Sequence, residues 1–254
     1  MPLDAPGVLF ALAVVALLYA SVGHAGASGY IAVLALALAG QPAEQIKPLA
    51  LLLNLVVASV GCWNFLRAGH LPLRRIWPVY LFAMPAAFLG GWLNLPSTWF
   101  RRLVGLVLLF SAWRLGRQNQ DPPQLREPGP VPLALSGAGL GLLAGLTGTG
   151  GGVFLTPLML LCRWCSTRQA AAVSVLFILL NSAAGLTGLF RARPQVVLDL
   201  LQPSLALAAL VVLVAGAIGS RLGSRHWPVA WIRRCLAVVL LLASWKLLGL
   251  GALL

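Results

Sequence analysis

Carboxylate side chains are scarce in this sequence. Aspartate and glutamate account for 5 of its 254 residues, and all charged residues together for 9%. Soluble domains carry about 25% charged residues, so this composition argues against a soluble fold. The acids lie in tails or loops, or near the start of an apolar segment: Asp4, Glu44, Asp121, Glu127 and Asp199. Carboxylate proton relays and carboxylate cages for cations are therefore not expected within a membrane.

Cysteine and histidine are too few and too scattered to suggest a metal or catalytic centre. Cys162 and Cys165 have the spacing of a redox or zinc pair, but no further ligands lie nearby in the sequence. Cys62 and Cys235 fall in apolar runs and fit buried packing residues. The zinc-protease pattern His-Glu-x-x-His is absent. We expect no catalytic residue, no metal and no cofactor.

Apolar residues are what the chain has in abundance. It is 60% hydrophobic, and its mean hydropathy of +0.92 is typical of a polytopic membrane protein. Eighteen lysines and arginines give a net charge of +13. Basic residues of membrane proteins collect in short loops, so the expected partner is a lipid bilayer and not nucleic acid. The sequence leaves open whether the chain forms a homo-oligomer.

Apolar segments follow one another along the whole chain. A single span needs about 20 apolar residues. Two pairs of segments, 7–22 with 27–39 and 131–146 with 152–162, are each too long for one straight helix and short for two full spans. Glycine interrupts both pairs, so we predict two bent or re-entrant hairpins. The remaining segments suit single crossings: 48–66, 77–93, 101–116, 170–190, 196–220 and 232–253.

The chain also repeats itself. Arg101–Leu115 returns as Arg233–Leu247 at an offset of 132, and Gly61–Ala68 returns as Gly185–Ala192 at an offset of 124. These matches predict a membrane repeat over 1–116, a polar linker loop over 117–130 and a second membrane repeat over 131–254. The predicted fold class is an all-α polytopic membrane protein. It consists of two inverted repeats, each a glycine-broken hairpin followed by three transmembrane helices.

Loop charge predicts the orientation of this arrangement. If each hairpin returns to the side it came from, one face holds 12 lysines and arginines and the other holds 6. If each hairpin were a single crossing, the split would be 9 to 9. The positive-inside rule favours the first scheme, which places both termini outside. Repeated halves place a substrate site at their interface near the membrane midplane.

The two glycine-rich interruptions are the candidate binding site. Irregular backbone at membrane depth is tolerated only where it is buried in protein or lines a cavity. A helix broken there directs N–H groups and a positive dipole end inward, which suits a small anionic substrate. The candidate substrate-binding residues are Gly23, His24, Gly26, Ser28 and Gly29 in the first break, and Thr147, Gly148, Thr149, Gly150, Gly151 and Gly152 in the second.

Five polar side chains of these segments and their neighbours have two interpretations each. We expect His24 to donate to the substrate or to carry a coupling proton, rather than only to bond a neighbouring helix. Thr147 and Thr149 either contact the substrate or bond back to helix carbonyls. Asn54 and Asn181 lie in apolar helices, where an amide either bonds between helices or lines the site.

Three other function classes share some of these features. An anion channel shares all of them, and a partner subunit is also compatible with the sequence. The segment Gly26-Ala-Ser28-Gly29 resembles the nucleophile motif of rhomboid intramembrane proteases. An intramembrane serine hydrolase needs a histidine base facing Ser28 from another helix, whereas His24 lies on the same short segment.

The combination of motifs resembles the sulfite exporter TauE/SafE family of membrane transporters. The resemblance rests on the second break, Gly145-Leu-Thr-Gly-Thr-Gly-Gly-Gly followed by Pro157, and on the helix segment Asn181-Ser-Ala-Ala-Gly185. The first break departs from the family pattern, because His24 and Ser28 stand where a glycine triplet is usual. The resemblance implies a multi-pass protein of the bacterial inner membrane that transports sulfite, sulfonates or other small organic anions. We expect a secondary transporter, acting as an exporter.

Overall fold

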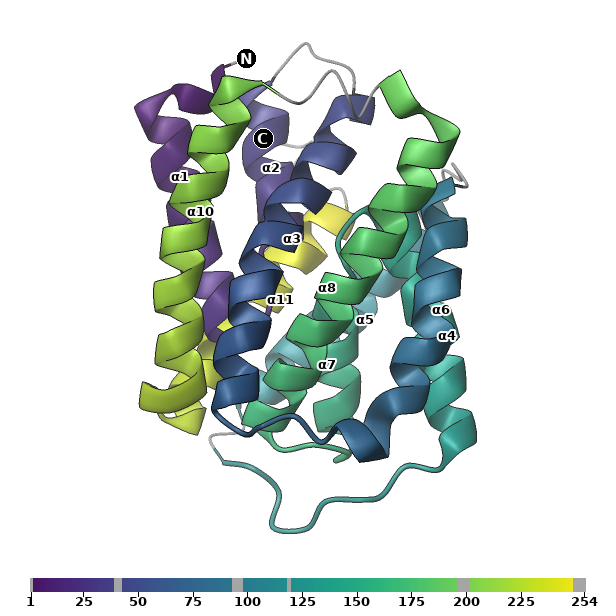
Figure 1. Cartoon of the computed structure of the whole chain (residues 1–254). Coiled ribbons are helices and arrows are strands. Elements are labelled where there is room, and N and C mark those ends of the chain that lie inside the picture. The colour runs from purple at the N-terminus through teal and green to yellow at the C-terminus, as the bar shows by residue number, and fades with distance from the viewer. Residues whose placement is uncertain (1, 39–42, 93–97, 118–119, 196–201, 249–254) are drawn as a thin grey trace.

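The computed structural model describes residues 2–38, 43–92, 98–117, 120–195 and 202–248, and within these ranges every regular element is helical. Figure 1 shows the helices side by side in one bundle. In chain order the elements are η1 (Pro2–Asp4), α1 (Pro6–Ser21), α2 (Ala27–Ala37), α3 (Ala43–Arg67), α4 (Leu73–Trp92), α5 (Thr98–Gly116), α6 (Pro130–Thr147), α7 (Gly152–Leu161), α8 (Thr167–Ala192), α10 (Pro203–Arg221), η2 (Leu222–His226) and α11 (Val229–Leu248).

The predicted helix interruptions are confirmed. The first break lies between the end of α1 at Ser21 and the start of α2 at Ala27, and the second lies between the end of α6 at Thr147 and the start of α7 at Gly152. Left-handed backbone produces both turns, with φ of +100° at Gly26 and +80° at Gly151. A residue with a Cβ is strained there, which explains why glycine marks both breaks.

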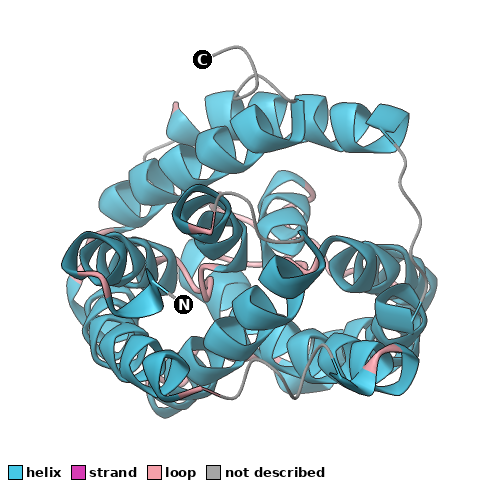
Figure 2. Cartoon of the chain, turned by 90° about the horizontal axis from the view of Figure 1, so that it is seen from above, coloured by secondary structure: helices cyan, strands magenta, loops and turns pink. Residues whose placement is uncertain are grey.

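Four of the described helices are long and apolar enough to cross a membrane: Ile46–Arg67, Pro130–Thr147, Thr167–Ala192 and Pro203–His226. Large apolar side chains cover the outside of the bundle, as expected of a surface that faces lipid tails. Examples at least half exposed are Phe10, Leu36, Leu81, Phe110, Leu135, Leu210 and Trp231. Figure 2 shows the bundle from above; the helices along one edge lie strongly tilted relative to the others, which are seen nearly end-on.

Small residues allow α4 and α6 to pack with their backbones almost in contact. A Cβ added at Gly137 or Gly141 of α6 would collide with the carbonyl oxygens of Val79 and Ala83 of α4. Such close approach is the usual basis of helix association in membranes, where burial of apolar surface gives no driving force. The same kind of contact joins α10 to α1, where Gly219 lies against the backbone of Leu17.

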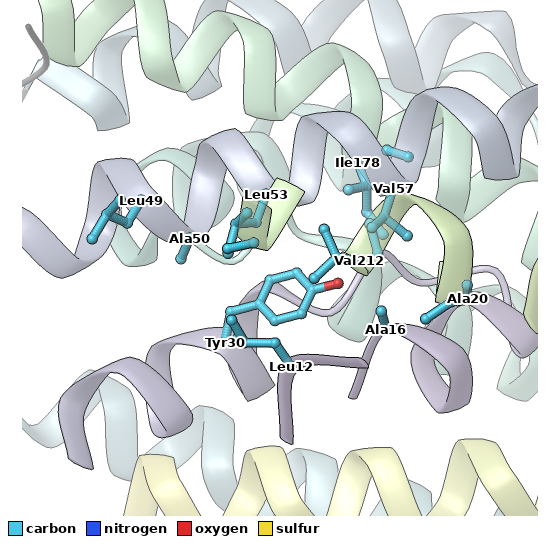
Figure 3. Close-up of a cluster of buried hydrophobic side chains, with 14 of the residues drawn as sticks. Leu12, Ala16, Ala20, Tyr30, Leu49, Ala50, Leu53, Val57, Ile178 and Val212 are labelled. Atoms are coloured by element: carbon cyan, nitrogen blue, oxygen red, sulfur yellow. The ribbon is translucent and has the colours of Figure 1, made fainter. Parts of the chain in front are cut away.

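Helix α8 separates two clusters of buried apolar side chains. One cluster lies among α1, α2, α3, α8 and α10, and the other among α4, α5, α7, α8 and α11. Figure 3 shows the first cluster, in which Tyr30 of α2 lies among Leu12, Leu53 and Val212. The Tyr30 hydroxyl is buried and has no hydrogen-bond partner among the described residues.

The two faces of the bundle differ in charge. The loops 68–72, 120–129 and 162–166 lie at the bottom of Figure 1, opposite η1 and the starts of α3 and α10. We call the bottom face the arginine-rich face, because its loops and helix ends carry Arg74, Arg75, Arg126, Arg163 and Arg168.

The linker, predicted only as a polar loop, is tied to this face by a partly buried ion pair. Asp121 accepts hydrogen bonds from Arg233 Nη2 of α11 (3.1 Å) and from the backbone N–H of Thr167 of α8 (2.9 Å). Arg233 Nε also donates to Thr167 Oγ1 at 2.9 Å. The Arg233 side chain is 1% exposed, so a guanidinium read from sequence as a loop charge is in fact buried.

We expect Asp121→Asn to lower the free energy of unfolding by about 2 kcal/mol, because the substitution removes the negative charge that faces the buried Arg233 guanidinium. The loss falls below the 3–5 kcal/mol of a fully buried pair, since the Asp121 side chain is 28% exposed. Thermal unfolding of the purified protein in detergent measures it. Glu127→Gln is the matched control and should have little effect, because Glu127 is 87% exposed and lies 3.9 Å from Arg75. Equal losses in both variants would contradict the expectation.

Candidate functional site

The two breaks lie against one another in the middle of the fold. A Cβ added at Gly152 in the second break would lie 3.4 Å from Cδ2 of His24 in the first. A Cβ added at Gly150 would lie 2.5 Å from Asn54 Nδ2 and 2.9 Å from Ser182 Oγ. Residues far apart in the sequence, from α3, α8 and both breaks, therefore form one cluster. We call this cluster the break site.

Asn54 of α3 joins the first break to α8. Its Oδ1 accepts the N–H of Ala27, the first residue of α2, at 3.0 Å, and its Nδ2 donates to Ser182 Oγ at 2.9 Å. The N-cap position of α2 is Gly26, which has no side chain to cap the helix. Asn54 supplies that cap from another helix, so both ends of its amide are engaged within the protein.

The start of α7 has no such cap. Its N-cap is Gly151, and no side chain caps the helix. The N–H groups of Gly152 and Val153 make no hydrogen bond to another described residue. Unpaired N–H groups at a helix N-terminus carry the positive end of the helix dipole. The second break therefore presents unbonded backbone N–H donors. In the first break, the N–H of Ala27 is already bonded to Asn54.

Asn181 lies on the face of α8 that its neighbours Phe177 and Gly185 turn towards the second break, and its amide has no partner among the described residues. It is 1% exposed, and neither Nδ2 nor Oδ1 has a hydrogen-bond partner among the described residues. One turn before it, Phe177 Cε1 would lie 2.7 Å from a Cβ added at Gly151, and one turn after it, Gly185 lies against Gly145 of α6. Asn181 thus faces the second break. A buried amide without partners costs about 1–3 kcal/mol, and such a group calls for a ligand or water to satisfy it.

His24 is buried in a cluster of hydroxyl groups. Its Nδ1 lies 3.2 Å from the carbonyl oxygen of Val22, and its Nε2 lies 3.4 Å from Thr156 Oγ1 of α7. Thr156 in turn hydrogen-bonds Ser174 of α8 at 2.5 Å. The ring of Tyr19 meets the imidazole edge-on, with centroids 6.5 Å apart. A row of hydrogen-bonding side chains, His24, Thr156 and Ser174, therefore runs from the first break through α7 to α8.

The other predicted residues divide between the break site and helix packing. Ser28 Oγ donates to Tyr19 Oη at 3.1 Å. Thr147 Oγ1 bonds back to the Leu143 carbonyl at 2.7 Å and lies 2.8 Å from Thr149 Oγ1.

Gly23 and Gly29 serve close helix contacts. A Cβ on Gly23 would collide with the backbone of Ala171 in α8, and one on Gly29 would lie 2.5 Å from Val15 of α1.

Comparisons with known proteins decide the family. The sequence pattern of the sulfite exporter TauE/SafE family matches residues 8–247 of the chain. The chain belongs to the sulfite exporter TauE/SafE family. It is 38% identical over 253 residues, 98% of its length, to the whole of a "Probable membrane transporter protein y4hK" from Sinorhizobium fredii. No solved structure matches it. Both matches point to a membrane transporter and not to an enzyme.

Sequence reasoning placed Lys47 of this TauE/SafE protein among the loop charges and missed its contact with the break site. Lys47 lies in the first turns of α3, and its aliphatic stem crosses Gly148, at the start of the second break. Ser182 and Thr156 were also not singled out as site residues. In a sequence, such hydroxyl residues stand out only by their position within an apolar run. Serines that bond back to a carbonyl of their own helix occur in the same kind of position.

The cysteines of this protein are free thiols, including Cys162 and Cys165, whose spacing suggested a redox or zinc pair. Burial raises the pKa of the Cys165 thiol to about 11. A thiol that stays protonated is a poor nucleophile and a poor metal ligand. No group of three potential metal ligands occurs among the described residues.

We expect Asn54→Ala to cost about 2–3 kcal/mol of stability, because it leaves the buried N–H of Ala27 without an acceptor and Ser182 without a donor. Ser182→Ala should cost about 1 kcal/mol or less, since the capping bond to Ala27 survives. Thermal unfolding midpoints of the two variants in the same detergent measure the difference. A Ser182→Ala loss as large as that of Asn54→Ala would contradict the capping role.

Proposed function

We propose that this protein is a secondary transporter that binds a small oxyanion or organosulfur anion, such as sulfite or a sulfonate, at the break site. The observation that carries the proposal is the unpartnered Asn181 amide beside the uncapped start of α7. Backbone N–H groups at a helix N-terminus are a ready-made anion site, and the Asn181 NH₂ adds a side-chain donor. The family is that of sulfite exporters, which supports sulfite as the first substrate to test.

The charge inventory supports an anion over a cation. The described carboxylates, Asp4, Asp121 and Glu127, all lie in η1 or in the linker, outside the break site. The groups at the site are amide, hydroxyl and imidazole side chains and backbone N–H groups. Carboxylates are the charged ligands that a cation prefers, and none of the described ones lies at the site, whereas an oxyanion needs the donors that are present.

The pattern of contacts between helices supports inverted repeats, because equivalent helices of the two halves make equivalent interfaces. If α1, α2, α3, α4 and α5 correspond to α6, α7, α8, α10 and α11, the α1–α10 interface corresponds to the α6–α4 interface. The α3–α10 interface likewise corresponds to α8–α4, and α2–α3 to α7–α8. Related halves that share one site are the usual basis of alternating access. His24 and Asn181 are 2% and 1% exposed, which fits a closed state between the two open ones.

Orientation follows from the arginine-rich face. Membrane proteins keep basic loops in the cytoplasm, so we place this face inside and both termini outside the bacterial inner membrane. The proposed direction is export, from the arginine-rich face to the opposite one.

Asn181→Leu tests the proposal most directly. Leucine has a similar volume and removes an amide that has no partner, so the thermal midpoint should stay equal or rise. Binding should weaken at least tenfold, because the side-chain donor to the anion is lost. The measurement is a binding screen of purified protein against sulfite, thiosulfate, methanesulfonate and acetate, followed by flux in proteoliposomes.

Asn64→Leu is the matched control. Asn64 of α3 donates to Ser220 Oγ at 2.8 Å, so its loss should lower stability and leave binding unchanged. Unchanged binding by Asn181→Leu, or a loss of stability equal to that of Asn64→Leu, would argue against a ligand at Asn181.

Proton coupling through His24 is a second, separable part of the proposal. The imidazole is the one titratable side chain at the break site that changes charge between pH 5 and 8 in its unperturbed form. His24→Gln keeps a polar side chain but cannot take up a proton, so the pH dependence of flux should flatten across this range. An unchanged pH profile would remove proton coupling and leave anion binding intact.

An anion channel remains the competing class. The burial of the break residues favours a transporter, because a channel needs a continuous open path. Flux that saturates with substrate concentration and exchanges labelled for unlabelled anion supports the transporter, whereas unsaturable current under voltage supports the channel.

A further inference from the structure

The imidazole of His24 is held from both sides. The backbone N–H of His24 donates to the carbonyl oxygen of Tyr19 at 2.9 Å, which fixes the residue within the first break. On one side of the ring, Nδ1 lies 3.2 Å from the carbonyl oxygen of Val22. The opposite edge faces α7, where Nε2 lies 3.4 Å from Thr156 Oγ1 and Cδ2 would lie 3.4 Å from a Cβ added at Gly152.

These contacts determine which ring nitrogen carries the proton. A carbonyl oxygen can only accept a hydrogen bond, so Nδ1 must be the protonated nitrogen that donates to Val22. In a neutral imidazole the other nitrogen is then an acceptor. Nε2 therefore presents a lone pair to α7, and the Thr156 hydroxyl is the group that donates to it.

Ser174 completes the assignment of protons along the row of His24, Thr156 and Ser174. Its Oγ lies 2.5 Å from Thr156 Oγ1, and either hydroxyl could be the donor by geometry alone. Because the single Thr156 proton is directed at His24, Ser174 must donate in this pair. The three side chains are at most 2% exposed, so bulk water does not reach these hydrogen bonds.

The row can reverse its direction when the ring becomes charged. A proton taken up at Nε2 forms an N–H bond that needs an acceptor, and Thr156 Oγ1 becomes that acceptor when its own O–H rotates towards Ser174 Oγ. The Ser174 O–H then turns to the carbonyl oxygen four residues earlier in α8, a bond that serines in helices commonly make. The new N–H is the only covalent change, and Nδ1–H stays on Val22 throughout.

The titratable and charged groups around the row leave this role to the hydroxyls. On the α1 side, Tyr19 meets the imidazole edge-on, and its own hydroxyl is hydrogen-bonded elsewhere. Helix α7 contains no titratable side chain. On the α8 side, the ion pair of Arg233 with Asp121 lies at the start of the helix, about 10 Å along its axis from Ser174. Among the described residues, no charged side chain hydrogen-bonds to the row.

We propose that Thr156 and Ser174 are positioning residues for His24, which keep its Nε2 hydrogen-bonded both in the neutral ring, protonated on Nδ1, and after Nε2 has taken up a proton. The inference rests on the proposed function, in which His24 carries the coupling proton. A buried imidazole that lost its hydrogen bond on protonation would resist the change, whereas rotation of two hydroxyls lets this ring gain and release a proton inside the bundle.

Nitrogen-15 NMR of histidine-labelled protein tests the tautomer directly. The chain has three histidines, and the spectrum of His24→Gln assigns the His24 signals by difference. We expect the neutral His24 ring to carry its proton on Nδ1, whereas a ring in water favours Nε2. In Thr156→Val the signal of the unprotonated Nε2 should shift, because the O–H donor is lost. Thr187→Val is the matched control and should leave the signal in place, since the Thr187 hydroxyl donates to the Ala184 carbonyl of its own helix.

The pH profile of flux in proteoliposomes tests the reversal of the row. Thr156→Val removes the acceptor of the protonated Nε2, and bonds from charged donors are the stronger ones, so the midpoint of the profile should move to lower pH by about half a unit or more. Ser174→Ala should give a smaller shift in the same direction. Thr156→Ser keeps the hydroxyl and should retain the parent midpoint, as should Thr187→Val.

A parent ring protonated on Nε2, an unshifted midpoint in Thr156→Val, or an equal shift in Thr187→Val would overturn the positioning role. If Thr156→Val shows no flux at any pH, its Nε2 signal decides instead. A parent protein that transports none of the anions would overturn the proposed function, and a parent-like pH profile in His24→Gln would overturn its proton-coupling part. The NMR spectra need no flux, so in both cases they still decide whether Thr156 positions the ring.

Discussion

Backbone N–H and C=O groups inside a bilayer have no water to bond, and this constraint organises the whole molecule. Each helix break leaves such groups unpaired at membrane depth, where each costs several kcal/mol. The protein deals with the first break internally, through the Asn54 amide. It leaves the start of α7 uncapped and sets the unpartnered Asn181 beside it. The two breaks are therefore similar in sequence character but differ in their hydrogen bonding.

This difference has a simple electrostatic meaning. An amide oxygen at the start of α2 occupies the position that an anion would take at a free helix end. Of the two helix starts described here, the one at α7 keeps its N–H groups unbonded, and residues from both sides of the linker surround it. His24 of the first break and Gly152 of the second are in contact there, so any movement of one half relative to the other changes the site directly.

Much of this architecture was readable in the sequence. Composition predicted the all-helical membrane fold, and glycine runs inside apolar segments predicted both breaks, because few other residues tolerate left-handed backbone. The contacts of individual polar side chains were not readable. Asn54 and Asn181 both look like amides in apolar helices, and only the position of the second helix shows that one has two partners and the other none. Arg233 and Lys47 were predicted to be loop charges for a similar reason. The sequence places both residues at helix ends near the membrane surface, but it does not show that the linker covers Arg233 or that the second break lies against Lys47.

The glycine-mediated contact between α4 and α6 has a mechanical consequence. Carbonyl oxygens of Val79 and Ala83 lie where side chains of α6 would otherwise stand, so these helices cannot slide or separate without exposing bare peptide groups to lipid tails. Helices α1 and α10 are joined in the same manner. Each pair unites a helix that precedes the linker with one that follows it. These two close helix pairs therefore fasten the part of the chain before the linker to the part after it, at the level of the backbone and without any side chain between them.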